Sequence, residues 1–425
     1  MLNRAIAPTF SLPSALEITS SKTHKLSNGI PIQIVEGGTQ DVLRITFLFN
    51  AGTRHQAKAL IAATTLSMLT EGTKNHTANQ LAELLDYYGA YTDQGIDRDK
   101  AGISLYCLGK HIQNLLPLLQ EIILYPTFPE KQFETLINKK KQQLTVERQK
   151  VAYLAREQHQ AMLFGEKHPY GSYATPESYN KLNTGALIDF HKEYYKPEEC
   201  LIILAGKSCI QQIPLIESLF GKTTWPKTKP GMPKHFPIPS TTSEKQLTFT
   251  KSNAVQTAIR IGKISITQNH PDYVKLSILI TILGGYFGSR LMKNIREEKG
   301  YTYGIYASLV PFKEAGVIVI STEVGKQYQQ DTIDQVIYEI ERLRTEGISD
   351  EELALVKNYI AGEMIHSVDG PLALSELLES LSIFDQDFNY LTEAYRETAE
   401  VTKEELLRLA QTYLSVDDLK ICIVG

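Results

Sequence analysis

A proline-rich stretch near the middle of the chain limits what the sequence can fold into more than any other feature. Between Trp225 and Ser240 the sequence is WPKTKPGMPKHFPIPS, which holds five prolines. Proline fixes the backbone φ angle and removes an amide donor, so such a stretch forms an extended, semi-rigid spacer. We therefore predict a linker over residues 225–242 between two domains, one over residues 1–224 and one over residues 243–425.

The two halves resemble each other in their pattern, which favours two related domains. Each half ends in an amphipathic helix, a short polar turn and an apolar strand, FHKEYYKPEECLIILAGK in the first and LAQTYLSVDDLKICIVG in the second. Alternating runs such as IPIQIV and VLRITFLF have the period of half-buried strands, and helical runs follow them. Capping signals at Ser349 and Thr402 predict the starts of two helices. We predict an α+β fold in which each domain is an antiparallel sheet with helices packed on one face.

Composition and charge narrow the classes of function. Hydrophobic residues make up 42% and charged residues 22% of the chain, as in globular proteins. The formal net charge of −4 lacks the basic character of a nucleic-acid binder. The N-terminal stretch contains Pro8 and Pro13 and no continuous apolar run, so it predicts neither a signal peptide nor a membrane helix. The four cysteines form no C-x-x-C pair and are expected to be buried thiols. We expect a cytoplasmic protein without nucleic-acid or membrane partners.

The common catalytic motifs are absent from the sequence. None of the ten histidines forms H-E-x-x-H, H-x-x-E-H or another pair one helical turn apart, the spacing that lets two imidazoles reach one zinc ion. There is no G-x-S-x-G elbow and no G-x-x-x-x-G-K-[ST] phosphate loop. The glycines of ILGGYFGSR are interpreted as a turn between helices, because no strand precedes them.

The most unusual polar stretch is IREEKGYTYGIYASL, in which Arg296 and Tyr303 flank Gly300. A helix is expected to pass into an alternating strand at this point. Arginine offers five hydrogen-bond donors and tyrosine one, so the two side chains could converge on a carbonyl or an anionic centre. The alternative is a helix-end arginine and a sheet tyrosine without a ligand, which the residues alone favour.

Several stretches together resemble one family, the pitrilysin/insulinase-type peptidases with an inverted H-x-x-E-H zinc motif, in the branch similar to mitochondrial processing peptidase. The matching runs are LSNGIPIQIVEGG, FNAGTRHQ, LTEGTKNHTANQLAELLDYYGAYTDQGIDRDKAGISLYCL, LFGEKHPYG and LGGYFGSRLMKNIREEKGYTYGIYASL. They cover nearly the whole chain, and their order and spacing are more specific than any single motif.

The resemblance places the family's zinc motif on ATTLS, just before the segment EGT. Ala63 and Ser67 then replace the two zinc-binding histidines, Leu66 replaces the glutamate that activates water, and Gln143 replaces the third ligand. A methyl group, a hydroxyl and a neutral amide offer no strong zinc field, and leucine cannot accept a proton. We expect no peptidase centre, no metal and no cofactor in this chain.

Two histidines near the motif, His55 and His76, could be imagined as substitute zinc ligands. They lie outside the helix face that carries the motif, so we do not expect this role. The run Lys139–Lys141 could likewise line a chamber that attracts acidic peptides, but it is interpreted as a solvated helix face.

The resemblance also implies a role for the second half. In two-chain members of the family, one subunit carries zinc and its partner supplies an arginine and a tyrosine to the substrate, and Arg296 and Tyr303 match that pair. They would stabilise the oxyanion that develops on the neighbour's zinc. The run GAYTDQGIDRD corresponds to the edge strand on which the family binds peptides. Asp93 stands there where many relatives have asparagine, so we expect this edge to be structural here.

We therefore predict a non-catalytic subunit of a heterodimeric zinc peptidase, whose partner is a zinc-bearing homologue. The pair would enclose a chamber and cleave unfolded peptides. A homodimeric peptide-binding or scaffold protein of the same fold is the first alternative. An active zinc peptidase with an atypical site is the second.

Overall fold

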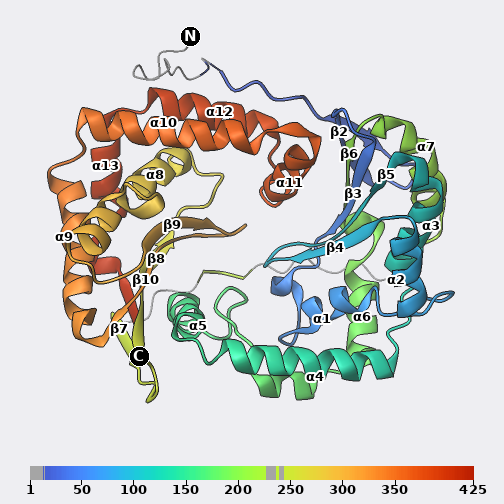
Figure 1. Cartoon of the computed structure of the whole chain (residues 1–425), viewed down its shortest axis with the longest axis horizontal. Coiled ribbons are helices and arrows are strands. Elements are labelled where there is room, and N and C mark those ends of the chain that lie inside the picture. The colour runs from blue at the N-terminus through green and yellow to red at the C-terminus, as the bar shows by residue number, and fades with distance from the viewer. Residues whose placement is uncertain (1–12, 14, 226–235, 239–243) are drawn as a thin grey trace, which may run out of the picture.

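The computed structural model describes residues 13, 15–225, 236–238 and 244–425. Most of the expected linker, residues 225–242, lies outside these ranges. Figure 1 shows two halves that face each other, each built on its own sheet. Trp225, the first residue of the expected linker, is buried in the first half, where its indole Nε1 donates a hydrogen bond to the carbonyl of Phe220 at 2.9 Å.

The first half contains a six-stranded sheet in the order β1-β2-β6-β3-β5-β4. Its strands are β1 (Lys22–Lys25), β2 (Pro31–Glu36), β3 (Val42–Phe49), β4 (Tyr91–Ile96), β5 (Ala101–Leu108) and β6 (Cys200–Gly206). Only the pair β2–β6 is parallel among these neighbours. Its helices are α1 (Ile61–Met68), α2 (Ala78–Tyr87), α3 (Ile112–Leu124), α4 (Glu130–Glu147), α5 (Val151–Phe164), α6 (Thr184–Tyr194) and α7 (Ile213–Ile216).

The second half contains a five-stranded sheet in the order β7-β11-β8-β10-β9. Its strands are β7 (Gln246–Phe249), β8 (Gln256–Ser265), β9 (Ile305–Pro311), β10 (Gly316–Gly325) and β11 (Lys420–Val424). Its helices are α8 (Tyr273–Ile280), α9 (Gln329–Thr345), α10 (Asp350–Ser367), α11 (Gly370–Ser382), α12 (Phe388–Glu400) and α13 (Lys403–Tyr413). The hydroxyls of Ser349 and Thr402 accept hydrogen bonds from the backbone amides three residues on, so both predicted helix starts are confirmed.

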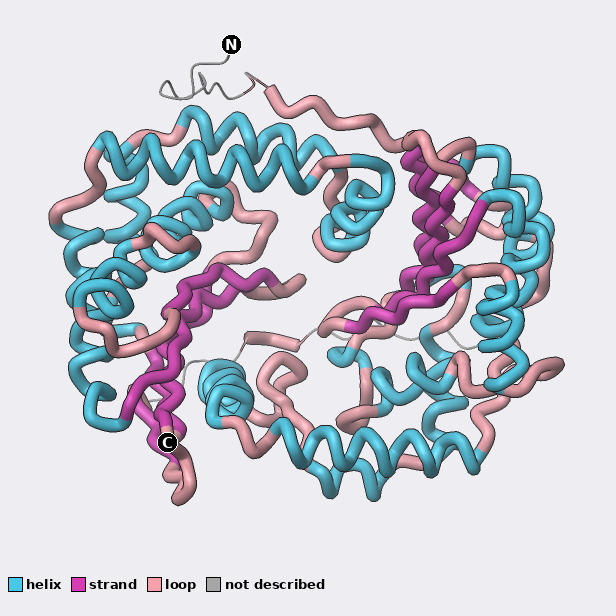
Figure 2. Tube along the Cα trace, viewed as in Figure 1, coloured by secondary structure: helices cyan, strands magenta, loops and turns pink. Residues whose placement is uncertain are grey.

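The two sheets have the same topology. The order β2-β6-β3-β5-β4 corresponds strand by strand to β7-β11-β8-β10-β9, and in each sheet the parallel pair joins the same two members. Figure 2 shows the two sheets as separate bundles of strands, with helices around them. The predicted α+β class with two related domains is confirmed.

Each sheet carries the helices of its own half on one face. The core of the first half lies between its sheet and helices such as α1, α3 and α6, and that of the second half between its sheet and α8, α9 and α13. The four cysteines are buried, as predicted, and burial raises the pKa of the Cys107 thiol to about 12.

The opposite face of each sheet receives one helix from the other half. Leu374, Leu378 and Leu381 of α11 pack on Val35 and Ile203 of the first sheet. In exchange, α5 packs through Val151 and Ala155 on strands β8 and β11 of the second sheet. Figure 1 shows both helices lying beside the sheet of the opposite half. The halves are therefore joined by apolar packing as well as by the chain between them.

Candidate functional site

The positions that the sequence resemblance assigns to the zinc motif lie on α1, which contacts β4 and β5. Ala63 lines a pocket, whereas Leu66 is only 2% exposed and belongs to the core of the first half. The Ser67 hydroxyl donates a hydrogen bond to the backbone carbonyl of Ala63 at 3.0 Å, so it serves the helix itself. Gln143 lies on α4, with its side chain exposed.

A zinc ion does not fit this set of residues. Alanine and leucine have no donor atom, and the serine hydroxyl is already bound to the helix backbone. Across the described part of the chain, no group of three His, Cys, Asp or Glu side chains is placed to hold a metal ion. The chemistry of α1 thus offers neither metal ligands nor a general base.

The two histidines near the motif have other neighbours. The His76 Nδ1 lies 2.8 Å from a carboxylate oxygen of Glu121, which is buried on α3. The ring of His55 lies 5.3 Å from that of Tyr194 on α6. Neither residue lines the pocket beside Ala63.

That pocket has a volume of about 370 Å³ and lies between α1, the turn after β4 and the helix α5. Arg98 reaches it from the turn and Arg156 from α5. Its one carboxylate, Glu157, forms an ion pair with Arg148. The pocket beside Ala63 is therefore lined by two guanidinium groups.

Arg296 and Tyr303 are brought together in the second half. Arg296 lies in the helical segment Met292–Glu298, and Gly300 takes a left-handed φ of 67° that turns the chain toward β9. The guanidinium of Arg296 lies 4.3 Å from the ring centre of Phe287 and 5.7 Å from that of Tyr303. Such distances are those of cation–π contacts.

This pair has unused hydrogen-bonding capacity. Tyr303 is 91% exposed, although tyrosine has a large apolar ring. The Nη1 of Arg296 is buried and has no hydrogen-bond partner among the described residues. Tyr303 also lines a pocket of about 340 Å³ on the second sheet, together with Arg260, Tyr306 and Glu323. The pair is thus placed to act on a group from outside the chain.

The edge strand β4 ends the first sheet and pairs only with β5 among the described strands. Asp93 is exposed on this strand and lines a pocket of about 320 Å³ with residues of α11, including Glu376 and Glu379. A second edge partner for β4 is geometrically possible, but the pocket beside it is rich in carboxylates.

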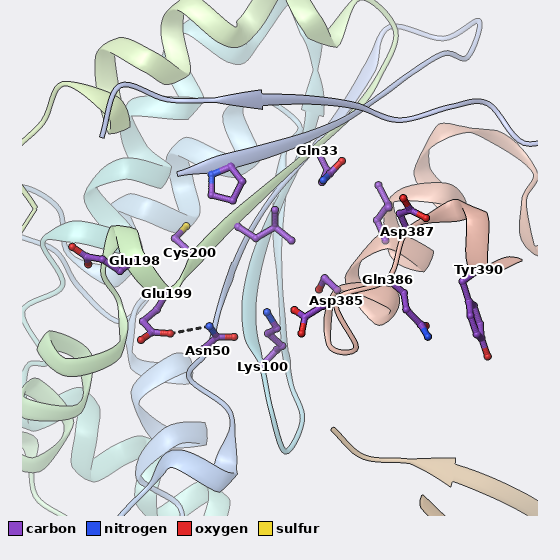
Figure 3. A pocket seen from close by; sticks show the side chains of 14 residues that line it. Gln33, Asn50, Lys100, Glu198, Glu199, Cys200, Asp385, Gln386, Asp387 and Tyr390 are labelled. Carbon is purple, nitrogen blue, oxygen red and sulfur yellow. Dashed lines mark hydrogen bonds between the residues drawn. The ribbon is translucent and has the colours of Figure 1, made fainter. Parts of the chain in front are cut away.

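A further pocket, of about 620 Å³, lies where the two halves meet (Figure 3). Glu199 and Lys100 reach it from the first half, and Asp385 and Asp387 from the loop before α12. The Glu199 carboxylate accepts a hydrogen bond from Asn50 at 2.8 Å, and Asp385 pairs with Lys313 at 3.3 Å. Burial lowers the pKa of Lys100, and the charge of Lys313 adds to this effect.

Sequence reasoning missed the arginines beside Ala63 and the pocket of Figure 3. Arg98 and Arg156 are 58 positions apart in the numbering and line the same pocket only because the fold brings α5 next to the turn after β4. The one sequence signal was the charged turn DRDK, which follows the predicted edge strand. No pattern in the sequence pairs it with α5.

Comparison with known proteins bears on these features. Residues 181–360 match the family described as the peptidase M16 inactive domain. An uncharacterized zinc protease of Bacillus subtilis, YmxG, is 24% identical over 357 residues, covering 82% of this chain and 84% of the relative. A protein of Helicobacter pylori described as a non-peptidase homolog, also YmxG, is 24% identical over 303 residues, covering 69% and 68%.

The fold comparison agrees with the sequence comparison. The crystal structure of a peptidase M16 inactive domain from Pseudomonas fluorescens superposes with a TM-score of 0.85 at 24% identity, covering 96% of this chain and 98% of that one. The resemblance to the inverted-zinc-motif peptidases is confirmed, and the findings support a non-catalytic protein of this kind. No helix in the described residues is long and apolar enough to cross a membrane.

Proposed function

We propose that this chain, with its M16-type fold and an inactive M16 domain over residues 181–360, is the non-catalytic subunit of a heterodimeric zinc peptidase. Its partner is a zinc-bearing homologue, and their substrates are unfolded peptides in the cytoplasm. Zinc resides in the partner, and this chain contributes Arg296 and Tyr303 to the partner's reaction.

The observation that carries the proposal is the arrangement of Arg296 with Tyr303. The guanidinium of Arg296, whose buried Nη1 has no partner among the described residues, lies 5.7 Å from the ring centre of Tyr303, which is 91% exposed. Tyr303 also lines a pocket on the second sheet. Donors fixed in this way can stabilise the negative charge that develops on a carbonyl oxygen during peptide hydrolysis. The residues of α1 offer no metal site and no activated nucleophile that could work together with these donors. The reacting carbonyl would therefore be held by another subunit.

The alternative is a homodimeric peptide-binding or scaffold protein, and the free edge of β4 is the feature that favours it. A peptide could add to this edge through main-chain hydrogen bonds without any hydrolysis. In that case Arg296 and Tyr303 would have no catalytic effect. The two functions are therefore separated by the kinetics of variants at these two residues.

The test uses the complex of this chain with the zinc-bearing homologue from the same cell, and measures hydrolysis of a fluorogenic unfolded peptide. Arg296→Ala and Tyr303→Phe are expected to lower kcat by about 10- to 100-fold with little change in KM, because the donors act mainly in the transition state. Arg396→Ala, at an exposed arginine of α12, is the matched control. Unchanged kcat in both variants would favour the scaffold function.

A further inference from the structure

The pocket beside Ala63 borders a position that the sequence resemblance assigns to a zinc ligand, yet two arginines line it. Its walls come from three places in the fold: the stretch Thr53–Ala63, the turn after β4, and α5 with the loop that follows it. The polar side chains that face it are Thr53, Gln56, Arg98, Tyr153, Arg156, Glu157, Gln160, Ser172 and Tyr173. Ala59, Leu60, Ala63 and Ala174 provide apolar wall.

The two arginines of the pocket have no carboxylate partner. Arg98 donates to the carbonyl of Pro169 at 3.2 Å and to the amide oxygen of Gln160 at 2.9 Å, and both of these acceptors are neutral. The guanidinium of Arg156 lies 4.8 Å from the ring centre of Tyr153. In the described part of the chain, neither arginine has a carboxylate oxygen within 4.0 Å.

The nearby carboxylates are engaged elsewhere. Glu157 pairs with Arg148, and Asp99 pairs with Arg54 at 2.8 Å. Asp97 accepts hydrogen bonds from two backbone amides in its own turn, at 2.6 and 2.7 Å. Asp97 and Asp99 act on Arg98, and Glu157 acts on Arg156, only through space. Among the described residues, no carboxylate therefore forms a direct ion pair with either arginine.

The electrostatics of the arginines agree with this geometry. Burial lowers the pKa of Arg98, and the charge of Arg156 lowers it further. The same two causes lower the pKa of Arg260, on the other side of α5, to about 10. Like charges that are partly desolvated repel one another, and a bound anion would relieve that repulsion.

The size and lining of the pocket indicate what kind of anion would bind. A volume of about 370 Å³ falls in the range of small-molecule sites and far exceeds what an inorganic anion fills. Part of the wall is alanine and leucine, which suits a short apolar side chain beside the charged group. Arginine presents two parallel donors that match a carboxylate.

We propose that the pocket beside Ala63 binds the carboxylate of a peptide, held by Arg98 and Arg156. The pocket beside the expected zinc-ligand position Ala63 would thus bind an anion instead of a cation. The carboxylate comes either from a C-terminus or from an acidic side chain. This inference goes beyond the proposed function, since it concerns this chain alone and requires no partner subunit and no hydrolysis.

The test measures binding of three peptides to the full chain by isothermal titration calorimetry. Acetyl-tetra-alanine with a free C-terminal carboxylate is compared with its amidated twin. An amidated peptide with one internal glutamate distinguishes a side-chain carboxylate from a terminal one. We expect at least one carboxylate-bearing peptide to bind about tenfold more tightly than the neutral peptide, or better. Equal binding of all three peptides, or binding by none, would overturn the proposal.

Variants of the pocket make the test specific. Arg156→Gln is expected to weaken binding of the carboxylate peptide at least about tenfold, and Arg156→Lys less. Arg396→Gln, at an exposed arginine of α12 that does not line the pocket, should leave binding unchanged. Thermal unfolding of the free variants controls for folding, and the peptide should raise the Tm of the wild type more than that of Arg156→Gln. Unchanged affinity in a folded Arg156→Gln chain would refute the assignment.

Discussion

We predict that three side chains on α1 prevent zinc binding in this protein. Ala63 and Ser67 offer a methyl group and a hydroxyl that is bonded to the helix, and Leu66 is part of the core. Their assignment to the zinc motif is a prediction from the sequence, based on the fixed spacing of the motif from the segment EGT. The positive charge of the pocket beside Ala63 could not be predicted, because Arg98 and Arg156 come from segments that are distant in the sequence.

Two buried histidines predict how the stability of the folded chain depends on pH. His159 is 1% exposed on α5, next to Arg260, and burial lowers its pKa to about 3. His191 is buried on α6, and burial lowers its pKa to about 4. Both are neutral in the folded chain at pH 7, whereas the unfolded chain takes up their protons below about pH 6.5. The folded state therefore loses stability as the pH falls from about 6.5 toward these values.

We expect each of these histidines to remove up to about 1.4 kcal/mol of unfolding free energy per pH unit in that range. His159→Gln should unfold at a lower temperature at pH 7.5, but its Tm should fall less between pH 7.5 and pH 5 than that of the wild type. Thermal unfolding monitored by circular dichroism measures both values. Parallel Tm curves for the two proteins would show that His159 is not buried in its neutral form.

The helices α5 and α11 are the elements that join the two halves. Each of them packs on the sheet of the opposite half. There it covers the face of the sheet that the helices of that half leave free. The starts of the neighbouring helices α10 and α13 could be predicted from the capping residues Ser349 and Thr402. Apolar periodicity indicates that a helix has a buried face, but it does not indicate which sheet that face contacts. The packing of α5 and α11 on the sheets of the opposite halves could therefore not be predicted.

The packing of α11 on the first sheet leads to a prediction for the free energy of unfolding. Leu378 of α11 is 4% exposed and packs against the first sheet, so Leu378→Ala should lower the free energy of unfolding by about 2–4 kcal/mol. Leu355→Ala on α10, where the side chain is 51% exposed, is the matched control and should change it by less than about 0.5 kcal/mol. Urea unfolding measures both. Equal effects of the two substitutions would contradict the packing of α11 on the first sheet.

At the scale of the whole molecule, buried ion pairs add to this packing. Arg54 of the first half pairs with Asp99 at 2.8 Å and with Glu314, from the turn between β9 and β10, at 2.6 Å. Arg44 of the first sheet forms an ion pair with Glu379 of α11 and donates to the Ser375 hydroxyl at 2.7 Å. Both groups of contacts cross between the halves and are largely shielded from solvent.

Arg54→Ala would remove the cation that pairs with the carboxylates of Asp99 and Glu314. We expect it to lower the free energy of unfolding by about 3–5 kcal/mol, because an uncompensated buried charge is costly. We also expect the two halves to unfold in more separate steps, visible by differential scanning calorimetry. Arg396→Ala, which removes an exposed ion pair on α12, should shift the transition by less than about 1 kcal/mol. A single unshifted transition in Arg54→Ala would show that this cluster does not hold the halves together.

We propose that this chain has no peptidase centre of its own and contributes residues to the zinc centre of a partner subunit. Zinc content and peptide hydrolysis, measured on the purified chain alone and after mixing with its zinc-bearing homologue, test it most directly. We predict that the lone chain binds no stoichiometric zinc and is inert, and that the mixture cleaves an unfolded peptide faster than the homologue alone. Stoichiometric zinc together with hydrolysis by the lone chain would contradict the claim, and would mean that Ala63, Leu66, Ser67 and Gln143 do not mark the metal position.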